Sequence, residues 1–215
     1  KLSGYASRDV RRALRKGQQA GLKVVEIPNS EKVKSAKILA KKEEQWLATK
    51  GRWSIGFLLS RIHTTYASLP QERWFKVIDD DNFIHAFVET TPYRQKNDHL
   101  CYYVDHMLQF PGGHRFALDF LLSHLAVTLK NEGCAELNLG FCAFQKTQPT
   151  TMIGLGLCLN RWFEPFYNSQ GIYLYKKKFS NKEVPRFLML NKQQPQWQQL
   201  LAMFQVTFRC QALFL

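Results

Sequence analysis

The sequence lacks a long uninterrupted apolar run. No stretch of about 18 consecutive apolar residues occurs in the chain, so no segment predicts a membrane-spanning helix. The given sequence also shows no signal-peptide pattern. Because the chain begins with Lys1 instead of methionine, we expect a fragment of a longer protein, and we leave open a membrane-spanning part before it.

Cysteine pairs and metal-binding spacings are missing as well. The five cysteines are odd in number and widely spaced, without a C-x-x-C pair, which predicts reduced and mostly buried thiols. The six histidines show no metal-ligand spacing. These absences argue against a disulfide framework and a zinc centre. The cysteines are Cys101, Cys134, Cys142, Cys158 and Cys210.

Several enzyme motifs are not found. The chain has neither a Walker loop nor a G-x-S-x-G elbow. Gly154-Leu155-Gly156 lacks the third glycine of a dinucleotide loop, and no strand is predicted before it. These observations argue against a P-loop nucleotidase, an α/β-hydrolase and a dinucleotide-binding enzyme.

Acidic residues are scarce beside basic ones. Thirty Lys and Arg stand against 17 Asp and Glu, a formal net charge of +13. Residues 1–50 hold 13 of the basic residues and 5 of the acidic ones, so +8 of the charge lies in the first quarter. This imbalance favours a polyanionic partner, either nucleic acid or an anionic bilayer surface, over a merely solvated basic face.

The basic charge follows a helical pattern near the N-terminus. Residues 5–20 carry an apolar stripe at i, i+3, i+4 and i+7 and an arginine stripe on the opposite face. The apolar residues are Val10, Ala13, Leu14 and Gly17, and the arginines are Arg8, Arg11, Arg12 and Arg15. Since the apolar face is committed to a core, the arginines form the best candidate surface for tRNA or a membrane.

The remaining pattern predicts a mixed α/β fold (α+β) with a largely antiparallel sheet flanked by helices. Gly21 ends the first helix, Ser30 caps the second, and Gly133 ends a later one. Asp79-Asp80-Asp81-Asn82 predicts a hairpin turn. Strands are predicted at 22–27, 74–78, 83–90, 100–108, 135–139 and 185–190, and helices at 5–20, 31–48, 116–131, 153–163, 170–179 and 195–207.

A glycine-containing loop joins the strand 100–108 to the helix 116–131. It reads Gln109-Phe110-Pro111-Gly112-Gly113-His114-Arg115, similar to the phosphate-binding Q/R-x-x-G-x-G/A loop of GNAT acyltransferases, except that His114 replaces the last small residue. In such loops the backbone N–H groups and the helix N-terminus hold a phosphate. A plain turn is the alternative, since Pro-Gly-Gly is common in turns.

Four groups of residues, spread along the chain, together form an ordered pattern. The ordered set is more specific than any single group. The first is Arg11-Arg12-Ala13-Leu14 with Gly21-Leu22-Lys23-Val24, and the second is Glu43-Glu44-Gln45-Trp46-Leu47 with Gly56-Phe57. The third is Val104-Asp105-His106-Met107 with Leu118-Asp119-Phe120. The fourth comprises Asn138-Leu139-Gly140, Tyr167-Asn168, Gly171, Tyr175-Lys176, Lys178-Phe179 and Pro185-Arg186-Phe187-Leu188.

In these residues the chain resembles the C-terminal catalytic domain of the lysyl-phosphatidylglycerol synthase family. The resemblance implies a tandem pair of GNAT-like units, with residues 1–70 as a basic helical segment and the remainder of the first unit. Residues 71–215 would then form the catalytic unit. It also implies transfer of an amino acid from aminoacyl-tRNA to a lipid headgroup such as phosphatidylglycerol, at the cytoplasmic face of the cell membrane.

The expected site follows from the resemblance and from the chemistry of an ester that is already activated, for which no cofactor or metal is needed. Asp105 is expected to orient the acceptor hydroxyl or to bind the aminoacyl ammonium; capping of the loop is the alternative. His106 is a candidate proton acceptor. Leu108 departs from the family, which has arginine there, and this puts the acceptor and the activity in question. The expected substrate-binding residues are Gln109, Gly112, Gly113, Arg115, Asn138, Lys176, Lys178 and Arg186.

Two further residues have structural alternatives. Asn138 is expected at the floor of the cleft or, equally, as a strand-end side chain satisfied by backbone. Asp119, in the first turn of its helix, is expected to stabilise the helix dipole. The apolar residues 200–215 belong to a core or touch a membrane.

Three other functions remain open. A Fem-like aminoacyltransferase would act on a peptidoglycan precursor, and a GNAT enzyme would use an acyl-CoA. A non-catalytic module would bind tRNA or an anionic membrane without a reaction. Neither the oligomeric state nor the amino acid carried follows from the sequence.

Overall fold

The computed structural model describes residues 8–49, 71–96, 98–142, 169–180, 182–185 and 198–199. The predicted helix 153–163, all but two residues of the predicted helix 195–207, and Arg186 lie outside these ranges. Of the predicted strand 185–190, only residue 185 is described, and it is not in a strand.

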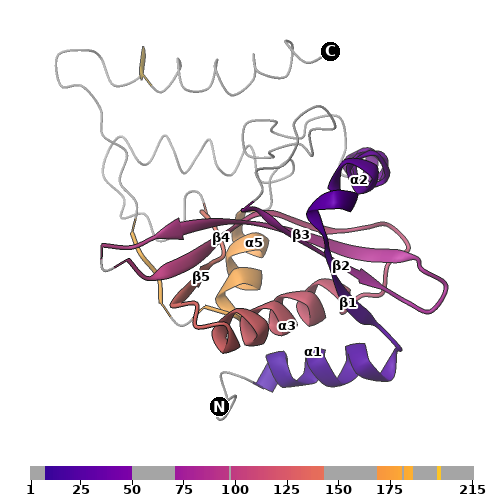
Figure 1. Ribbon diagram of the computed structural model, residues 1–215, viewed down its shortest axis with the longest axis horizontal. Coiled ribbons are helices and arrows are strands. Elements are labelled where there is room, and N and C mark those ends of the chain that lie inside the picture. The colour runs from indigo at the N-terminus through magenta and orange to yellow at the C-terminus, as the bar shows by residue number, and fades with distance from the viewer. Residues whose placement is uncertain are drawn as a thin grey trace.

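Five strands form one mixed sheet in sequential order, β1 to β5 (Figure 1). The first four pair in antiparallel fashion, and β4 pairs with β5 in parallel. The mixed, largely antiparallel sheet predicted from the sequence is therefore confirmed. The strands are β1 (Lys23–Ile27), β2 (Arg73–Ile78), β3 (Ile84–Arg94), β4 (Leu100–Gln109) and β5 (Glu136–Asn138).

The predicted hairpin turn joins β2 and β3. The Asn82 N–H donates to the Asp79 carbonyl over 3.2 Å, and Asn82 adopts a left-handed conformation with φ of 61°. Asparagine tolerates this conformation better than most residues do, which explains why an acidic run ending in asparagine turns here.

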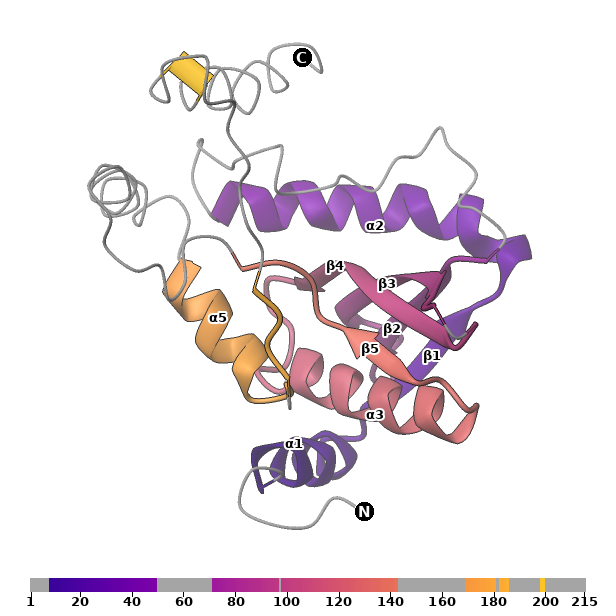
Figure 2. The same ribbon diagram turned by 90° about the vertical axis from the view of Figure 1, so that its left-hand side faces the viewer.

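Helices cover both faces of the sheet (Figure 2). Helix α2 (Asn29–Thr49) lies on one face, and α3 (Ala117–Asn131) lies on the other, with α1 (Arg8–Gln19) beside α3. Helix α5 (Ser169–Lys177) packs against the α3 side through Tyr175. Ser30 is not the cap that the sequence predicted, because α2 already begins at Asn29, directly after Pro28, whose ring presets a helical φ.

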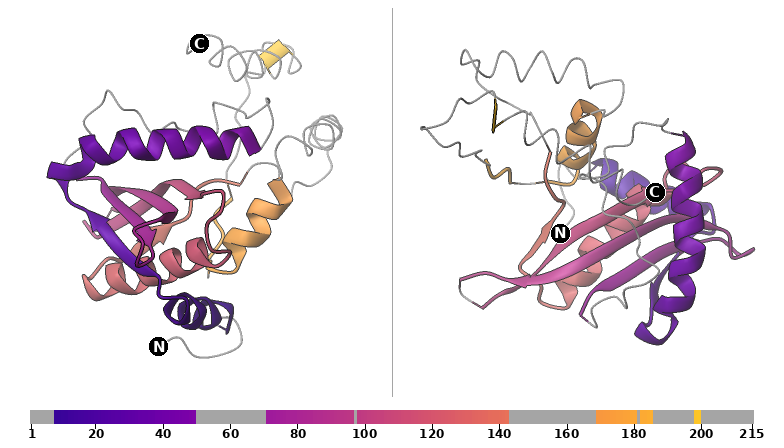
Figure 3. Two further views of the ribbon diagram at one scale, coloured as in Figure 1. Left: turned by 90° about the vertical axis from the view of Figure 1, so that its right-hand side faces the viewer. Right: turned by 90° about the horizontal axis from the view of Figure 1, so that it is seen from above.

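The two faces bury different cores. On the α3 side, β-strand residues such as Val77 and Val88 meet Leu121 and Leu125. On the α2 side, a smaller cluster contains Leu39, Phe87 and Leu108. Figure 3 shows α2 on one side of the sheet and the α1–α3 pair on the other. The sheet therefore separates two environments, and the face to which a strand residue points decides its neighbours.

Helices α1 and α3 approach each other at a glycine. A Cβ atom at Gly17 would lie 2.3 Å from Cδ2 of Phe120 and 2.9 Å from its Cβ. The apolar stripe of α1 thus faces α3, as predicted, with Ala13 and Gly17 buried. On the opposite face Arg8, Arg11, Arg12 and Arg15 are exposed.

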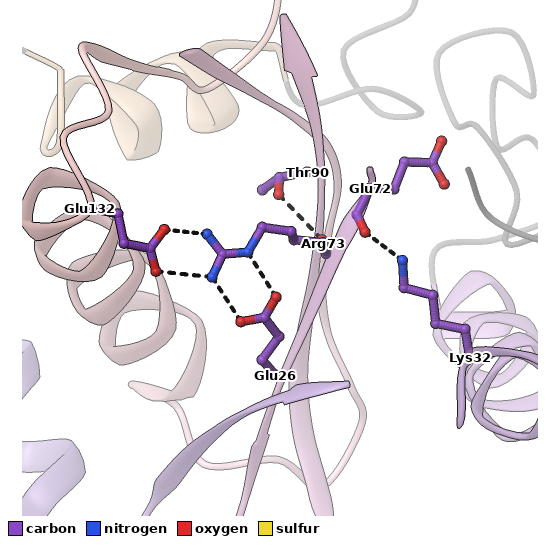
Figure 4. Close-up of polar contacts among 6 residues, drawn as sticks. All are labelled: Glu26, Lys32, Glu72, Arg73, Thr90 and Glu132. Atoms are coloured by element: carbon purple, nitrogen blue, oxygen red, sulfur yellow. Dashed lines mark hydrogen bonds and ion pairs between the residues drawn. The ribbon is translucent and has the colours of Figure 1, made fainter. Parts of the chain in front are cut away.

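Charged side chains connect the elements at one edge of the sheet (Figure 4). The Arg73 guanidinium donates to both carboxylate oxygens of Glu26, over 2.7 and 2.8 Å, and also to Glu132 at the end of α3. On the α2 side, the Lys32 ammonium donates to the Glu72 carbonyl. These contacts link β1, β2, α3 and α2.

The N-terminal segment takes part in the same fold as the later strands. All five residues of β1 pair with β2, and α1 packs on α3. The division into units at residues 1–70 and 71–215 stays a prediction. No helix in the described parts of the chain has the length and apolarity to cross a membrane.

Candidate active site

An irregularity in β4 shapes the candidate site. Glu89 of β3 pairs with His106, and Thr90 pairs with Val104, so Asp105 is an extra residue between two paired ones. Such a β-bulge bends the strand and redirects side chains. Here it places Asp105 beside Thr91 and His106 beside Glu89, so both side chains lie on the α2 face.

The bulge lies where β4 and β5 part. The two strands pair only from Cys101 to Tyr103 on β4 and from Glu136 to Asn138 on β5. Within the described ranges, no strand pairs with residues 104–109 on that side of β4. Asp105 is thus the second β4 residue beyond the parallel pairing, at the start of the unpaired edge.

Asp105 is exposed and accepts a hydrogen bond from the Thr91 hydroxyl. Partial desolvation of its carboxylate by the sheet raises the pKa of Asp105 above its ordinary value, and the charge of Glu89 adds to this. The Thr91 hydroxyl and His106 act in the opposite direction. A carboxylate that is both accessible and made more basic is suited to hold or accept a proton.

His106 is buried beneath α2, with 5% of its surface exposed. Its Nδ1 lies 2.6 Å from Oε2 of Glu89, and its Nε2 lies 3.9 Å from Oε1 of Glu43. Both ring nitrogens therefore face carboxylates of the protein. The role of proton acceptor stays a prediction, and this burial separates His106 from the exposed Asp105.

Sequence reasoning missed Glu43 and Glu89. Glu43 is 4% exposed and continues the buried stripe of α2 formed by Ala36 and Leu39. Glu89 follows Phe87 by two residues on the α2 face of β3. In the sequence, the sign of their role is an acidic residue at a position that the pattern otherwise fills with buried apolar residues. A buried carboxylate needs a partner, so such a position indicates a polar cluster.

Leu108 occupies the position where the sequence comparison expects arginine. It points to the α2 face and is 2% exposed, in the cluster that contains Leu39 and Phe87. The site therefore has an apolar contact where a guanidinium would have supplied charge. Neither Gln109 nor Arg115 reaches this place: the Gln109 amide donates to the His114 carbonyl over 3.3 Å, and the Arg115 guanidinium lies over the Phe116 ring.

The loop after β4 uses many of its own N–H groups. Phe110 donates to the His85 carbonyl over 3.0 Å, Gly113 to the Phe110 carbonyl over 3.0 Å, and His114 to Nδ1 of His85 over 3.0 Å. The His114 bond requires the other ring nitrogen of His85 to carry the proton, and that nitrogen lies 3.0 Å from Asp79. A phosphate here would have to displace these bonds or be held by side chains.

Glycine is required at two positions of this loop for different structural reasons. Gly112 has a φ of 74°, in the left-handed region. At Gly113 a Cβ atom would lie 2.7 Å from the His85 carbonyl oxygen, so the close approach of the two backbones requires glycine. Both residues shape the turn, while their predicted part in substrate binding stays a prediction.

A second polar group lies at the end of β5. The Asn138 side-chain oxygen accepts the Gly140 N–H over 2.9 Å, the backbone-satisfied alternative expected for this residue. The Lys176 ammonium of α5 donates to the Phe141 carbonyl over 3.3 Å. Burial lowers the pKa of Lys176, and the Cys142 thiol works in the opposite direction. A poorly solvated ammonium near the β4–β5 divergence is suited to an anionic group.

Lys178 has a different environment. Its ammonium lies 3.2 Å from Asp119 in the first turn of α3 and 4.4 Å from the centre of the Tyr175 ring. Asp119 thus combines a helix N-terminal position with an ion pair. The hydroxyl of Tyr175 is buried, and desolvation raises its pKa. This cluster ties α5 to α3, so Lys178 has less freedom than Lys176 to bind a substrate.

Other parts of the surface are less suited to the chemistry. A cavity of about 580 Å³ is lined by residues that include Glu26, Glu72, Arg73 and Tyr102, and none of the sequence-predicted site residues. The Arg73 cation there is already matched by two carboxylates. Among the described residues, no group of three or more His, Cys, Asp or Glu side chains is arranged to hold a metal ion.

Known proteins share this fold and sequence pattern. A family model described as phosphatidylglycerol lysyltransferase, C-terminal, matches residues 1–190. The crystal structure of the C-terminal domain of a putative lysylphosphatidylglycerol synthetase from Agrobacterium fabrum superposes with a TM-score of 0.58 and 22% identity, covering 83% of this chain and 52% of that one. L-PGS from Bacillus licheniformis gives a TM-score of 0.58 and 17% identity, covering 74% and 48%.

A curated relative is an uncharacterised protein of Corynebacterium glutamicum, 26% identical over 141 residues, which are 63% of this chain and 17% of that protein. The chain thus spans about half of the two solved structures and a smaller share of this relative. The mixed α/β fold expected from the sequence is confirmed, and the C-terminal domain of the lysylphosphatidylglycerol synthetase shares it. With a family model matching residues 1–190, the chain belongs to the family of phosphatidylglycerol lysyltransferase C-terminal domains.

Proposed function

We propose that this chain transfers an aminoacyl group from an aminoacyl-tRNA to the headgroup of a membrane lipid such as phosphatidylglycerol. Membership of the family supports the lipid product. The observation that carries the proposal is the exposed Asp105 on the β4 bulge, at the point where β4 and β5 part. A reacting hydroxyl needs an accessible proton acceptor within hydrogen-bond reach.

Asp105 is the group that handles the acceptor. The lipid hydroxyl oxygen attacks the aminoacyl carbonyl carbon, a new ester bond forms, and the bond to the terminal ribose oxygen of the tRNA breaks. The Asp105 carboxylate takes the hydroxyl proton and returns it to the departing ribose oxygen, so that protons balance without a cofactor. The raised pKa of Asp105 suits it to accept this proton better than an ordinary aspartate.

Positive side chains supply contacts to phosphates. Lys176 is the strongest candidate for the phosphate of the lipid or of the tRNA end, because burial has removed part of its hydration. Arg115 is a further candidate at the loop before α3. Lys178, Asn138 and Gln109 would act mainly by holding the surrounding elements, and Arg186 lies outside the described residues.

The arginine face of α1 is proposed to bind the tRNA or the anionic membrane surface. Arg8, Arg11, Arg12 and Arg15 are exposed on one side of a helix whose other side is buried. The reaction would then occur at the cytoplasmic face of the membrane, where charged tRNA and anionic lipid meet. Neither contact needs base-specific recognition.

The test is lipid analysis by mass spectrometry in cells that express the full-length protein. Aminoacylated phosphatidylglycerol is expected with the wild-type protein and is expected to fall by about 10²-fold or more with Asp105→Asn, which keeps the side-chain shape. Asp98→Asn, on an exposed turn, is the matched control. Unchanged product in Asp105→Asn would refute the catalytic assignment.

The donor is tested separately. Ribonuclease treatment of the reaction is expected to abolish transfer from an aminoacyl-tRNA and to leave an acyl-CoA enzyme unaffected. A Fem-like enzyme would share the ribonuclease sensitivity but would modify a peptidoglycan precursor instead of a lipid.

A non-catalytic tRNA- or membrane-binding module is the second candidate function. The buried, apolar Leu108 favours it, since no cation stands at that position to complete the site. This candidate predicts tRNA or vesicle binding by the wild-type chain with no aminoacylated lipid in the mass spectra.

A further inference from the structure

A row of polar side chains crosses the sheet under α2. Trp74 of β2, Glu89 of β3 and His106 of β4 are direct cross-strand neighbours. The Trp74 indole N–H donates to Oε1 of Glu89 over 3.0 Å, and His106 Nδ1 donates to Oε2 over 2.6 Å. Each oxygen of the Glu89 carboxylate is thus held by one donor, which fixes both the carboxylate and the imidazole ring.

Helix α2 completes this cluster from above. Oε1 of Glu43 lies 3.9 Å from Nε2 of His106, and both residues are buried. Two carboxylates in a place with little water are costly unless a positive or hydrogen-bonding group lies between them. His106 occupies that place, so its position is set from both sides of the ring.

Asp105 is the covalent neighbour of His106 and lies on the same face because of the bulge. The Asp105 carboxylate accepts a hydrogen bond from the Thr91 hydroxyl, and the adjoining residue His106 is held by Glu89. Two of the three ionisable groups of the cluster also act on Asp105: Glu89 raises the pKa of Asp105, and His106 lowers it. Geometry and electrostatics at Asp105 therefore depend on the same two residues.

We propose that His106 is a positioning residue which, held between Glu89 and Glu43, fixes the β4 bulge so that Asp105 alone meets the acceptor group. This inference rests on the proposed transferase function. It reassigns His106 from proton acceptor to support, because the ring is buried and directs its two nitrogens at carboxylates instead of at the exposed side of the bulge. It also gives Glu43 and Glu89 a part in the site.

The first test needs no substrate. In the 215-residue chain, the Asp105 carboxyl is titrated by ¹³C NMR in wild type, His106→Gln and Glu89→Gln. Loss of His106 is expected to raise the pKa of Asp105, and loss of the Glu89 charge is expected to lower it. Opposite shifts cannot come from a general loosening of the fold, which would move both variants in the same direction. His124→Gln, an exposed histidine on α3, is the control and is expected to leave the titration unchanged.

A shift in the same direction in both variants, or no shift in either, would overturn the inference. Glu89→Gln is isosteric with the wild-type residue, so it keeps the test decisive where His106→Gln does not fold. A fall in the pKa of Asp105 supports the proposal in that variant alone, and a rise or no change contradicts it.

The second test measures transfer. His106→Gln is expected to lower kcat by about 10- to 100-fold with an unchanged KM for aminoacyl-tRNA, as misplacement of one reacting group does. Restoration of kcat by added imidazole would show that His106 itself transfers the proton, and would overturn the positioning role. Opposite NMR shifts with no aminoacylated lipid from wild type would uphold the positioning and refute the proposed function, so the two failures are distinguishable.

Discussion

At the residue scale, position 108 holds a buried leucine, whereas the family resemblance leads one to expect an arginine there. The side chain lies among apolar neighbours on the α2 face, including Phe87 and Leu39. A guanidinium in such a place would lose its hydration, and the carboxylates of Glu43 and Glu89 under α2 already face His106. Leu108 is thus part of a packed core as well as of the candidate site.

We therefore expect Leu108→Arg to destabilise the chain by about 3 kcal/mol or more, because it buries an unpaired charge and overpacks the cluster. Leu108→Met, which keeps the volume and the apolar character, is expected to cost less than about 1.5 kcal/mol. Urea unfolding followed by circular dichroism measures both. Equal stability of Leu108→Arg and wild type would mean that the arginine escapes from this core.

At the scale of elements, two contacts join pieces that are distant in sequence. Gly17 lets α1 approach the Phe120 ring of α3. The loop after β4 is bonded to His85, whose ring also meets Asp79 at the β2–β3 turn. Both contacts fix the position of α3 or of the loop before it, the segment that resembles a phosphate-binding loop.

Gly17→Ala is expected to lower the free energy of unfolding by about 1–3 kcal/mol, since the new methyl group would overlap the base of the Phe120 side chain. The sign is informative because alanine normally favours a helix over glycine by about 1 kcal/mol. Gln18→Ala, on the exposed side of the same helix, should stay within about 0.5 kcal/mol of wild type. Thermal unfolding of the three proteins gives the comparison, and a stabilised Gly17→Ala would show that the helices do not meet there.

The Asp79 contact predicts a dependence on pH. Burial acts to raise the pKa of Asp79, but the Phe83 N–H and His85 outweigh it, so the pKa is lowered in the folded state. A lowered folded pKa contributes stability above the unfolded value, near 3.9, and this contribution is lost as the pH falls through the folded value.

The difference in unfolding free energy between wild type and Asp79→Asn should therefore be constant at neutral pH and shrink below about pH 4. Asp81→Asn, in the same turn, is the control. Urea unfolding at a series of pH values measures the difference, and a gap that widens on acidification would contradict the assignment.

At the scale of the whole molecule, the sheet separates the basic face from the candidate site. Helix α1, which carries the arginines, lies on the α3 side of the sheet, and α2 lies on the other side (Figures 1 and 2). Asp105 accepts a hydrogen bond from Thr91, on the α2 side. A polyanion on the arginine face therefore does not reach Asp105 through the sheet. For the tRNA proposed above, this geometry requires that it bind one face and bring its aminoacyl end to the other.

Arg12→Ala with Arg15→Ala is expected to weaken tRNA binding and to reduce the dependence of log K on log salt by roughly 1–2, about 0.7–0.9 for each lost phosphate contact. Lys34→Ala with Lys37→Ala removes the same charge from the exposed side of α2 and is the matched control. Filter binding across a salt series makes the comparison. An equal loss in both double variants would show that net charge alone matters.

The sequence pattern predicts the regular elements better than it predicts the site. Strand alternation and helical periodicity depend on local burial, and they give α1, β2, β3 and α3 to within a few residues, apart from the end of β3. The bulge in β4 cannot be predicted from the sequence. One extra residue only shifts the alternation of buried and exposed side chains, and the segment still has the pattern of a strand. The role of Glu43 and Glu89 likewise cannot be predicted from the sequence, because it depends on the packing of α2 and β3 around His106.

The bulge sets Asp105 apart from its neighbours in β4. Without Asp105, the order Val104, His106, Met107, Leu108 alternates between the two faces with no interruption. Asp105 is thus a residue that the sheet accommodates and does not itself require. Replacing Asp105 is therefore expected to change the chemistry at that place at little cost in folding free energy, whereas the side chains of Val104, His106 and Leu108 are buried and needed for packing.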